Sequence, residues 1–147
     1  MKHLAVIDES KFPEKGNINY TGKDSLGRTL AVYGTITYEM VEKSANETRP
    51  SFKEKDIPSG WNKNHKVKFD TTTGLYDGWF WNRSHLVADR LGGETTSQNA
   101  ITGTRMQNVG NRNNTGGMVY IEEIATNYLK EHKDKSLYYS AEPIYNE

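Results

Sequence analysis

A histidine and two asparagines between residues 81 and 108 have the types and spacing that suit hydrolysis of a phosphodiester. His85 ends a stretch rich in large side chains, and Asn99 and Asn108 follow after a glycine-containing loop. A neutral imidazole, with an ordinary pKa near ~6.5, can take a proton from water at neutral pH. An asparagine amide oxygen is a hard, neutral ligand for Mg²⁺, which keeps several waters and needs few protein ligands. The segment therefore predicts a metal-assisted attack of water on phosphorus.

Cationic side chains close to this segment could hold an anionic substrate. Arg83 and Arg105 can each bind a phosphate through paired N–H donors. Arg83 has an alternative role, because it could instead pair with Asp89 or Glu94. A basic stretch with interleaved aromatic residues lies upstream, and within it we expect Lys66 and Lys68 to contact phosphates, with a solvated charged loop as the alternative. The stretch comprises Lys53, Lys55, Trp61, Lys63, Lys66, Lys68 and Phe69.

Composition narrows the classes of protein that this chain can represent. Its 147 residues suggest a single domain, with residues 1–19 as an extended arm. The net charge of zero excludes a strongly basic coat but leaves room for a local basic groove. The absence of cysteine excludes disulfides, thiol nucleophiles and cysteine-based zinc sites. The sequence contains no 18-residue apolar window, so we expect no contact with a membrane interior.

The residues that carry chemistry must be positioned by strands and one helix. Alternation predicts strands over 30–41, 66–69, 79–87, 99–103 and 137–141, and a turn at Gly74 and Gly78. Residues 8–25 and 42–60 read as loops, and residues 104–109 as the start of a helix. On the strand 79–87, Trp79 and Trp81 share a face and are expected in the core, with base or sugar stacking as the alternative.

The clearest helix is predicted over 118–132. An apolar stripe on it should face the core and comprises Ile121, Ile124, Ala125, Tyr128, Leu129 and His132. Together these elements indicate an α+β fold with a dominant antiparallel sheet and one main packed helix.

The segment Asn82-Arg-Ser-His85 resembles the Asp-Arg-Gly-His motif of the DNA/RNA non-specific endonucleases, the ββα-metal or His-Me finger nucleases. The longer run 82–93 is still more similar to the streptococcal secreted DNases (streptodornases). Further similarity extends over 20–28, 57–61, 99–109 and 117–118, so that most of residues 20–145 is covered.

The resemblance implies a role for each matching residue. His85 would be the general base, Asn108 the side-chain ligand of Mg²⁺ (with Mn²⁺ as an alternative ion), and Asn99 a residue that stabilises the site around the base. Glu122 would hold a metal-bound water, and Arg83 would support the site. The implied reaction is endonucleolytic cleavage of DNA, and of RNA, to products with 5′-phosphates.

The chain departs from the family in two respects. Asn82 and Ser84 replace the commoner Asp and Gly, as they do in the streptococcal branch. The family's further C-terminal strands are missing, which predicts an open sheet edge suited to dimer formation. Rival hypotheses are a catalytically incomplete module that binds nucleic acid or an inhibitor protein, and a carbohydrate-binding β-domain that uses the tryptophans.

The biological setting has two readings. The apolar run from Leu4 to Ile7 is too short for a signal peptide, so a secreted virulence or scavenging DNase would have lost its signal. A toxin delivered into a target cell is the alternative, and it would require an immunity protein as a partner.

Overall fold

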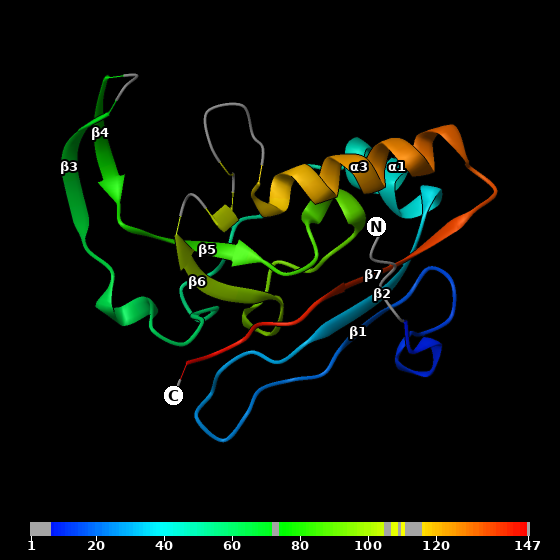
Figure 1. The fold of residues 1–147 in the computed structure, drawn as a ribbon, viewed down its shortest axis with the longest axis horizontal. Coiled ribbons are helices and arrows are strands. Elements are labelled where there is room, and N and C mark those ends of the chain that lie inside the picture. Colours follow the sequence, from blue (N-terminus) through cyan, green and yellow to red (C-terminus); the bar gives the residue numbers. More distant parts are fainter. Residues whose placement is uncertain (1–6, 72–73, 105–106, 109, 111–115, 147) are drawn as a thin grey trace, which may run out of the picture.

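The computed structural model describes residues 7–71, 74–104, 107–108, 110 and 116–146. Its fold is α+β: a three-stranded sheet, two antiparallel hairpins and the two helices α1 and α3 (Figure 1). This agrees with the predicted class, although the strands form several small antiparallel sheets instead of one dominant sheet. None of the described helices is long and apolar enough to span a membrane.

The three-stranded sheet lies on one side of the core, opposite the helices. Its order is β1 (Ile18–Tyr20), β2 (Val32–Thr37) and β7 (Ser136–Ala141), with both pairings antiparallel. Helices α1 (Tyr38–Asn46) and α3 (Met118–Glu131) lie on one side of it in Figure 1. The core between them is apolar and comprises Val32, Ile36, Val41, Leu86, Val87, Ala88, Leu91, Ala125 and Leu129.

The strand predicted over 30–41 is wrong beyond Thr37. Strand β2 ends at Thr37, which is the N-cap of α1, and the Thr37 N–H donates to Met40 Sδ at 3.4 Å. The alternation of apolar and polar residues continues through Met40, but it does not make this segment a strand. Residues after Thr37 include strong helix formers such as Glu39, Glu42 and Lys43, so the segment folds as a helix. The loop predicted over 42–60 therefore begins only after Asn46.

Helix α3 confirms the predicted helix but not its predicted buried face. The buried side chains are Glu122, Ala125, Thr126 and Leu129, whereas Ile121 and Ile124 are about half exposed. The stripe is rotated because the helix rests on the core through Ala125 and Leu129 only, and its neighbouring residues line a cavity. A carboxylate thus occupies a position where an apolar pattern would place a core residue.

Two hairpins follow each other between the helices. Strand β3 (Lys66–Thr71) pairs with β4 (Gly74–Trp79), and β5 (Trp81–His85) pairs with β6 (Ala100–Thr104). The strand over 99–103 is confirmed within one residue, but the strand over 79–87 is divided at Phe80. The turn expected at Gly74 and Gly78 is instead strand β4, in which every residue pairs with β3.

The described parts of the loops contain four short 3-10 helices. They are η1 (Glu9–Lys11), η2 (Trp61–Lys63), η3 (Asp89–Leu91) and η4 (Ser97–Asn99). The segment before β1 lies along the sheet, because Gly16 N–H donates to the Thr35 carbonyl and Thr35 Oγ1 donates to the Pro13 carbonyl. The predicted extended arm is thereby tied to β2 over its described part.

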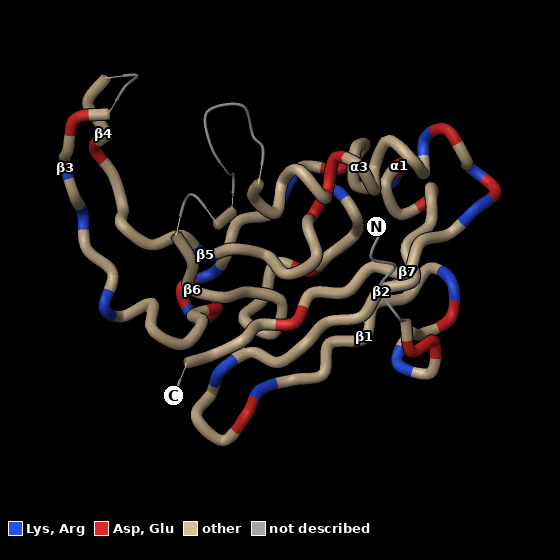
Figure 2. The backbone as a smooth tube through the Cα atoms, in the orientation of Figure 1, with Lys and Arg blue, Asp and Glu red and all other residues tan. Residues whose placement is uncertain are grey.

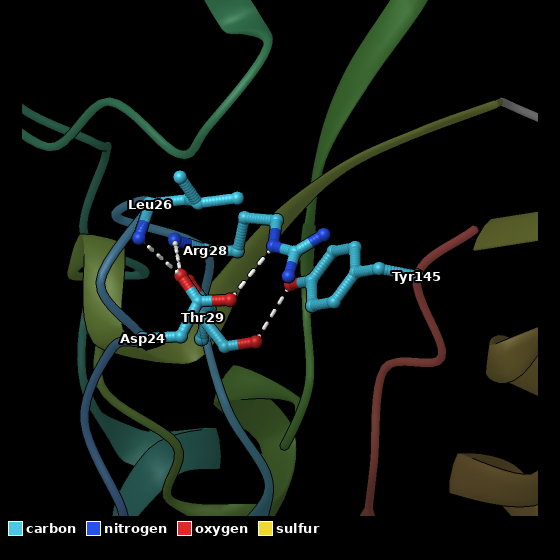
Figure 3. Close-up of polar contacts among 5 residues, drawn as sticks. All are labelled: Asp24, Leu26, Arg28, Thr29 and Tyr145. Atoms are coloured by element: carbon cyan, nitrogen blue, oxygen red, sulfur yellow. Dashed lines mark hydrogen bonds and ion pairs between the residues drawn. The ribbon is translucent and has the colours of Figure 1, made fainter. Parts of the chain in front are cut away.

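A polar cluster joins the loop after β1 to the C-terminal segment (Figure 3). The Asp24 carboxylate accepts the N–H groups of Leu26 and Arg28 and, at 2.7 Å, the Nε–H of Arg28. The Arg28 guanidinium lies 4.8 Å from the centre of the Tyr145 ring, and the Tyr145 hydroxyl donates to the Thr29 carbonyl at 2.6 Å. The last described residues are thus held against the 24–29 loop.

Candidate functional site

His85 occupies the last position of β5 and is 9% exposed. Its backbone is fixed by the β5–β6 ladder, in which it pairs with Ala100. The ring packs on Phe52 with centroids 4.8 Å apart, and Nε2 lies 3.3 Å from Thr95 Oγ1. Burial, aided by the charge of Arg49, lowers the pKa of His85 to about 4 although Asp89 opposes the shift. The imidazole is therefore neutral at pH 7, the form that can accept a proton.

A cavity of about 740 Å³ opens beside His85. Its walls come from α1, the 49–52 loop, β5, η3 and α3. Cations outnumber acids in this lining, which gives the cavity a positive character although the chain has no net charge. Such a cavity favours an anionic ligand over a neutral one. The charged lining residues are Arg49, Arg83, Arg90, Lys130, Asp89 and Glu122.

Glu122 reaches this cavity from α3 and is 5% exposed. Burial raises the pKa of its carboxyl, while Arg90 and Arg49 act in the opposite direction and Glu123 adds to the rise. A buried acid that faces two arginines can hold a water or a cation in place. The structure thus brings Glu122 into one cavity with His85.

Asn108 also lines the cavity and is half-buried. Strand β6 ends at Thr104, whose Oγ1 accepts the Gln107 N–H at 3.2 Å, and Gln107 and Asn108 are helical. The hydroxyl thereby caps the turn that follows the strand. Strand β5, the loop, strand β6 and this turn form a strand–loop–strand–helix unit that carries His85 and Asn108 toward the same space.

Asn99 is fully buried and does not line the cavity. Its Oδ1 accepts the Val87 N–H at 2.9 Å, and its Nδ2 donates to the carbonyls of Val87 and Glu94, both at 2.8 Å. The amide therefore fixes the loop that follows His85 and presents Thr95 to the ring. This contact set supports a positioning role through the backbone.

Arg83 lies in β5 two residues before His85 and lines the cavity. Its guanidinium sits 4.9 Å from the ring centres of both Phe52 and Trp61, and its Nη1 donates weakly to the carbonyls of Lys53 and Asp56 at 3.4 Å. The alternative pairing with Asp89 or Glu94 does not occur among the described contacts.

The other predicted contacts with nucleic acid lie away from the cavity. Lys68 pairs with Asp77 at 3.4 Å, and Lys66 lies 5.5 Å from the centre of the Trp79 ring. Trp79 is 48% exposed, so its expected place in the core is wrong: β4 belongs to a hairpin with an open face. Arg105 lies outside the described residues.

Sequence reasoning missed Phe52, Thr95, Arg49 and Arg90 as parts of the site. Phe52 and Arg49 lie in a polar loop without periodicity, so no local pattern marks them. Thr95 and Arg90 follow the His85 motif closely in the sequence. This closeness along the chain was the only sequence signal that could have marked them as site residues. The charge of Arg49 acts on both His85 and Glu122.

The donor set fits a cation with oxygen ligands. Among the described residues, no three His, Asp or Glu side chains gather as a metal site. The Asn108 amide and the Glu122 carboxylate line one cavity, where water can complete the coordination of an ion that retains its own hydration. These residues therefore fit Mg²⁺ better than an ion that requires several nitrogen or sulfur ligands.

The fold and the site together define a class of protein. Its members have a strand–loop–strand–helix unit that carries a neutral histidine into a cationic cavity. The family model described as DNA/RNA non-specific endonuclease matches residues 3–147. The chain is 33% identical, over 156 aligned residues and 88% of its length, to a protein named "Deoxyribonuclease" from Streptococcus dysgalactiae subsp. equisimilis. This chain belongs to the DNA/RNA non-specific endonuclease family.

A solved structure has the same fold. It is described as "Structure of Sda1 nuclease with bound zinc ion", and it superposes with a TM-score of 0.78 at 34% identity over 89% of this chain. The chain spans 47% of the streptococcal deoxyribonuclease and 64% of the solved chain.

Proposed function

We propose that this chain is a metal-dependent endonuclease that hydrolyses phosphodiester bonds of DNA, and also of RNA, with little sequence preference. The observation that carries the proposal is the convergence of His85, Asn108 and Glu122 on one cavity with excess positive charge. Membership of the non-specific endonuclease family supports the same reaction class. Contacts to phosphates instead of base edges would explain a weak base preference.

His85 would act as the general base. When its Nε2–H donates to Thr95 Oγ1, Nδ1 is the basic nitrogen and takes a proton from the attacking water. Phe52 on the ring face and the Asn99-anchored loop hold the imidazole in this orientation. The low pKa keeps the base unprotonated at neutral pH.

Asn108 would hold a divalent cation through its amide oxygen, and Glu122 would orient water of that ion. When bound there, Mg²⁺, or Mn²⁺ in its place, would stabilise charge on the phosphate and on the leaving 3′-oxygen. The arginines of the cavity would hold the substrate phosphates, with Arg83 beside the base. Cleavage of the bond to the 3′-oxygen leaves a 5′-phosphate on the product.

The test is degradation of supercoiled plasmid and of RNA in Mg²⁺ and in EDTA. Wild-type protein should degrade both in Mg²⁺ and neither in EDTA, and His85→Ala and Asn108→Ala should be inactive. His132→Ala is the matched control, because His132 is exposed at the end of α3. Retardation of plasmid without cleavage would overturn the enzymatic proposal in favour of a binding module.

We further propose that the protein acts outside the cell that makes it, as the similarity to secreted streptococcal DNases suggests. Detection of the protein and its nuclease activity in the culture medium of a producing cell would support this. A co-produced inhibitor together with activity confined to recipient cells would favour the delivered-toxin alternative.

A further inference from the structure

Aromatic and cationic side chains form a continuous row from His85 to the β3–β4 hairpin. Each neighbour in the row contacts the next: the distances between ring centres, or between a cation and a ring centre, run from 4.8 to 6.5 Å. In order, the row comprises His85, Phe52, Arg83, Trp61, Trp79 and Lys66. It joins the cavity to a part of the molecule that the sheet and helices do not cover.

The two ends of the row differ in exposure. His85 is buried in the cavity, whereas Trp79 is 48% exposed and Lys66 is exposed on the neighbouring strand. The β3–β4 hairpin stands apart from the sheet and from both helices (Figure 1), and Figure 2 shows lysines along β3. The row therefore leads from the cavity to an exposed surface on the hairpin.

The cations of the row retain donors for a ligand. Arg83 has five N–H donors, and among the described contacts only its Nη1 has partners, both at 3.4 Å. Lys66 contacts the face of the Trp79 ring and is in none of the described ion pairs. By contrast, Lys68 is paired with Asp77. The row thus offers unneutralised charge next to an aromatic side chain that is 48% exposed.

Alternating aromatic faces and cations match the chemistry of a single nucleic-acid strand. The phosphates of such a strand meet the cations, and its bases can swing out and stack on aromatic rings. In a duplex the base faces are covered by neighbouring bases and cannot reach a ring. The rings of Trp61 and Trp79 contact each other with centroids 6.5 Å apart, so a base would stack on the exposed part of the Trp79 ring.

We infer that Trp79, supported by Trp61, is a base-stacking subsite, on the hairpin and away from the cavity, for a single-stranded segment that continues from the scissile phosphate. The inference rests on the proposed function for the position of that phosphate. It gives the enzyme tighter binding to single-stranded or frayed nucleic acid than to intact duplex. The preference is independent of base identity, because every base has a face that can stack.

The test measures equilibrium binding in a His85→Ala background, so that the strand is not cut. The probes are a single-stranded DNA of about 12 nucleotides, the same strand with abasic sites throughout, and its duplex. Trp79→Ala should weaken binding of the intact single strand about 5- to 100-fold. It should leave the abasic strand and the duplex within twofold of the parent protein.

Two further variants separate stacking from loss of structure. Leu75→Ala is the matched control, because Leu75 is exposed on the same strand β4 but does not belong to the row. It should leave all three affinities unchanged. Trp79→Phe keeps an aromatic face and should recover part of the single-strand affinity. An equal loss on single strand and duplex, or no loss on the single strand, would overturn the subsite.

The subsite and the proposed function fail in different ways. If wild-type protein cuts no nucleic acid but Trp79→Ala still loses single-strand binding selectively, the subsite stands and the enzymatic proposal falls. If wild-type protein cuts both nucleic acids while Trp79→Ala binds the single strand normally, the enzyme stands and the subsite falls.

Discussion

The side chain of Asn99 bonds both polar groups of the Val87 backbone, which lies two residues beyond His85. It accepts the Val87 N–H and donates to the Val87 carbonyl, and its second amide hydrogen goes to the Glu94 carbonyl. A single buried side-chain amide therefore satisfies backbone groups of this loop that strand pairing satisfies elsewhere in the chain. The loop holds Thr95 against the His85 ring.

Replacing Asn99 should destabilise the folded protein through this loop. Asn99→Ala leaves buried backbone groups without partners, so we expect a loss of about 3 kcal/mol in the free energy of unfolding. Urea denaturation measures it. Asn99→Asp, which retains an acceptor for Val87 but opposes two carbonyls, should lose a similar amount. Gln98→Ala is the control, because its bond to Glu94 is exposed, and it should lose less than about 0.5 kcal/mol. Equal effects at both positions would contradict the assigned role.

Gly93 should tolerate no side chain. A Cβ at this position would lie 1.8 Å from the Val87 carbonyl oxygen and 2.8 Å from Asn99 Nδ2. Both obstacles belong to the buried loop anchor, so Gly93→Ala should destabilise the fold by about 3 kcal/mol or more. Gly78→Ala is the control, since a Cβ there meets only the end of the Tyr76 side chain. Thermal unfolding of the two variants should differ clearly, and a neutral Gly93→Ala would refute the close approach.

The buried histidine should make stability depend on pH. The pKa of His85 is about 4 in the folded protein, below its ordinary value of 6.5. The unfolded chain therefore takes up the proton first as the pH falls, and the folded state loses stability between pH 6.5 and 4. The loss attributable to this group is at most about 3 kcal/mol.

A comparison of wild-type protein with His85→Gln across this pH range isolates the contribution. The stability of the wild type relative to the variant should decrease as the pH falls from 6.5 to 4 and stay constant above pH 7. A difference between wild type and His85→Gln that is independent of pH would show that His85 keeps its ordinary pKa.

The charged carboxylate of Glu122 should lower the stability of the folded protein. Burial raises the pKa of its carboxyl, which means that the charged form is disfavoured in the folded state. Glu122→Gln should therefore keep or increase the free energy of unfolding at pH 7. At the same time it should lower nuclease activity about 10- to 100-fold and raise the Mg²⁺ concentration for half-maximal rate.

Glu123→Gln is the matched control for this pair of measurements. Glu123 is the next residue on α3 and is exposed, so both readouts should remain at the wild-type level. A Glu122→Gln variant with full activity at low Mg²⁺ would remove Glu122 from the proposed site.

The local motif around His85 could be predicted from the sequence, whereas the surroundings that complete the site could not. Alternation located β6 within one residue and helical periodicity located α3, because each of these elements is specified by its own residues. The buried face of α3 was mispredicted, since Glu122 faces a cavity that α1 and the 49–52 loop help to form. Arg49 and Phe52 were missed for the same reason: tertiary contacts alone make them part of the site.

The hydroxyl of Tyr145 should contribute measurably to stability. It donates to the Thr29 carbonyl at 2.6 Å, and its ring lies under the Arg28 guanidinium (Figure 3). Tyr145→Phe keeps the ring and removes the hydrogen bond, so we expect a loss of about 1 kcal/mol in urea denaturation. Tyr138→Phe, at an exposed ring of β7, should change stability by less than half as much. A Tyr145→Phe variant as stable as wild type would show that the segment is not held by this bond.

The pairing of β2 with β7 sets an order in which parts of the chain can fold during synthesis. Thr29 and Tyr145 are 116 positions apart, and β2 finds its second neighbour only in residues 136–141. The β5–β6 hairpin, by contrast, joins strands that are close along the chain and can zip as soon as it is synthesised. A nascent chain can therefore form the hairpin that carries His85 before it can complete the three-stranded sheet. The cavity beside His85 is complete only once α3, which follows the hairpin along the chain, has also been synthesised, so the hairpin forms before the cavity that it helps to line.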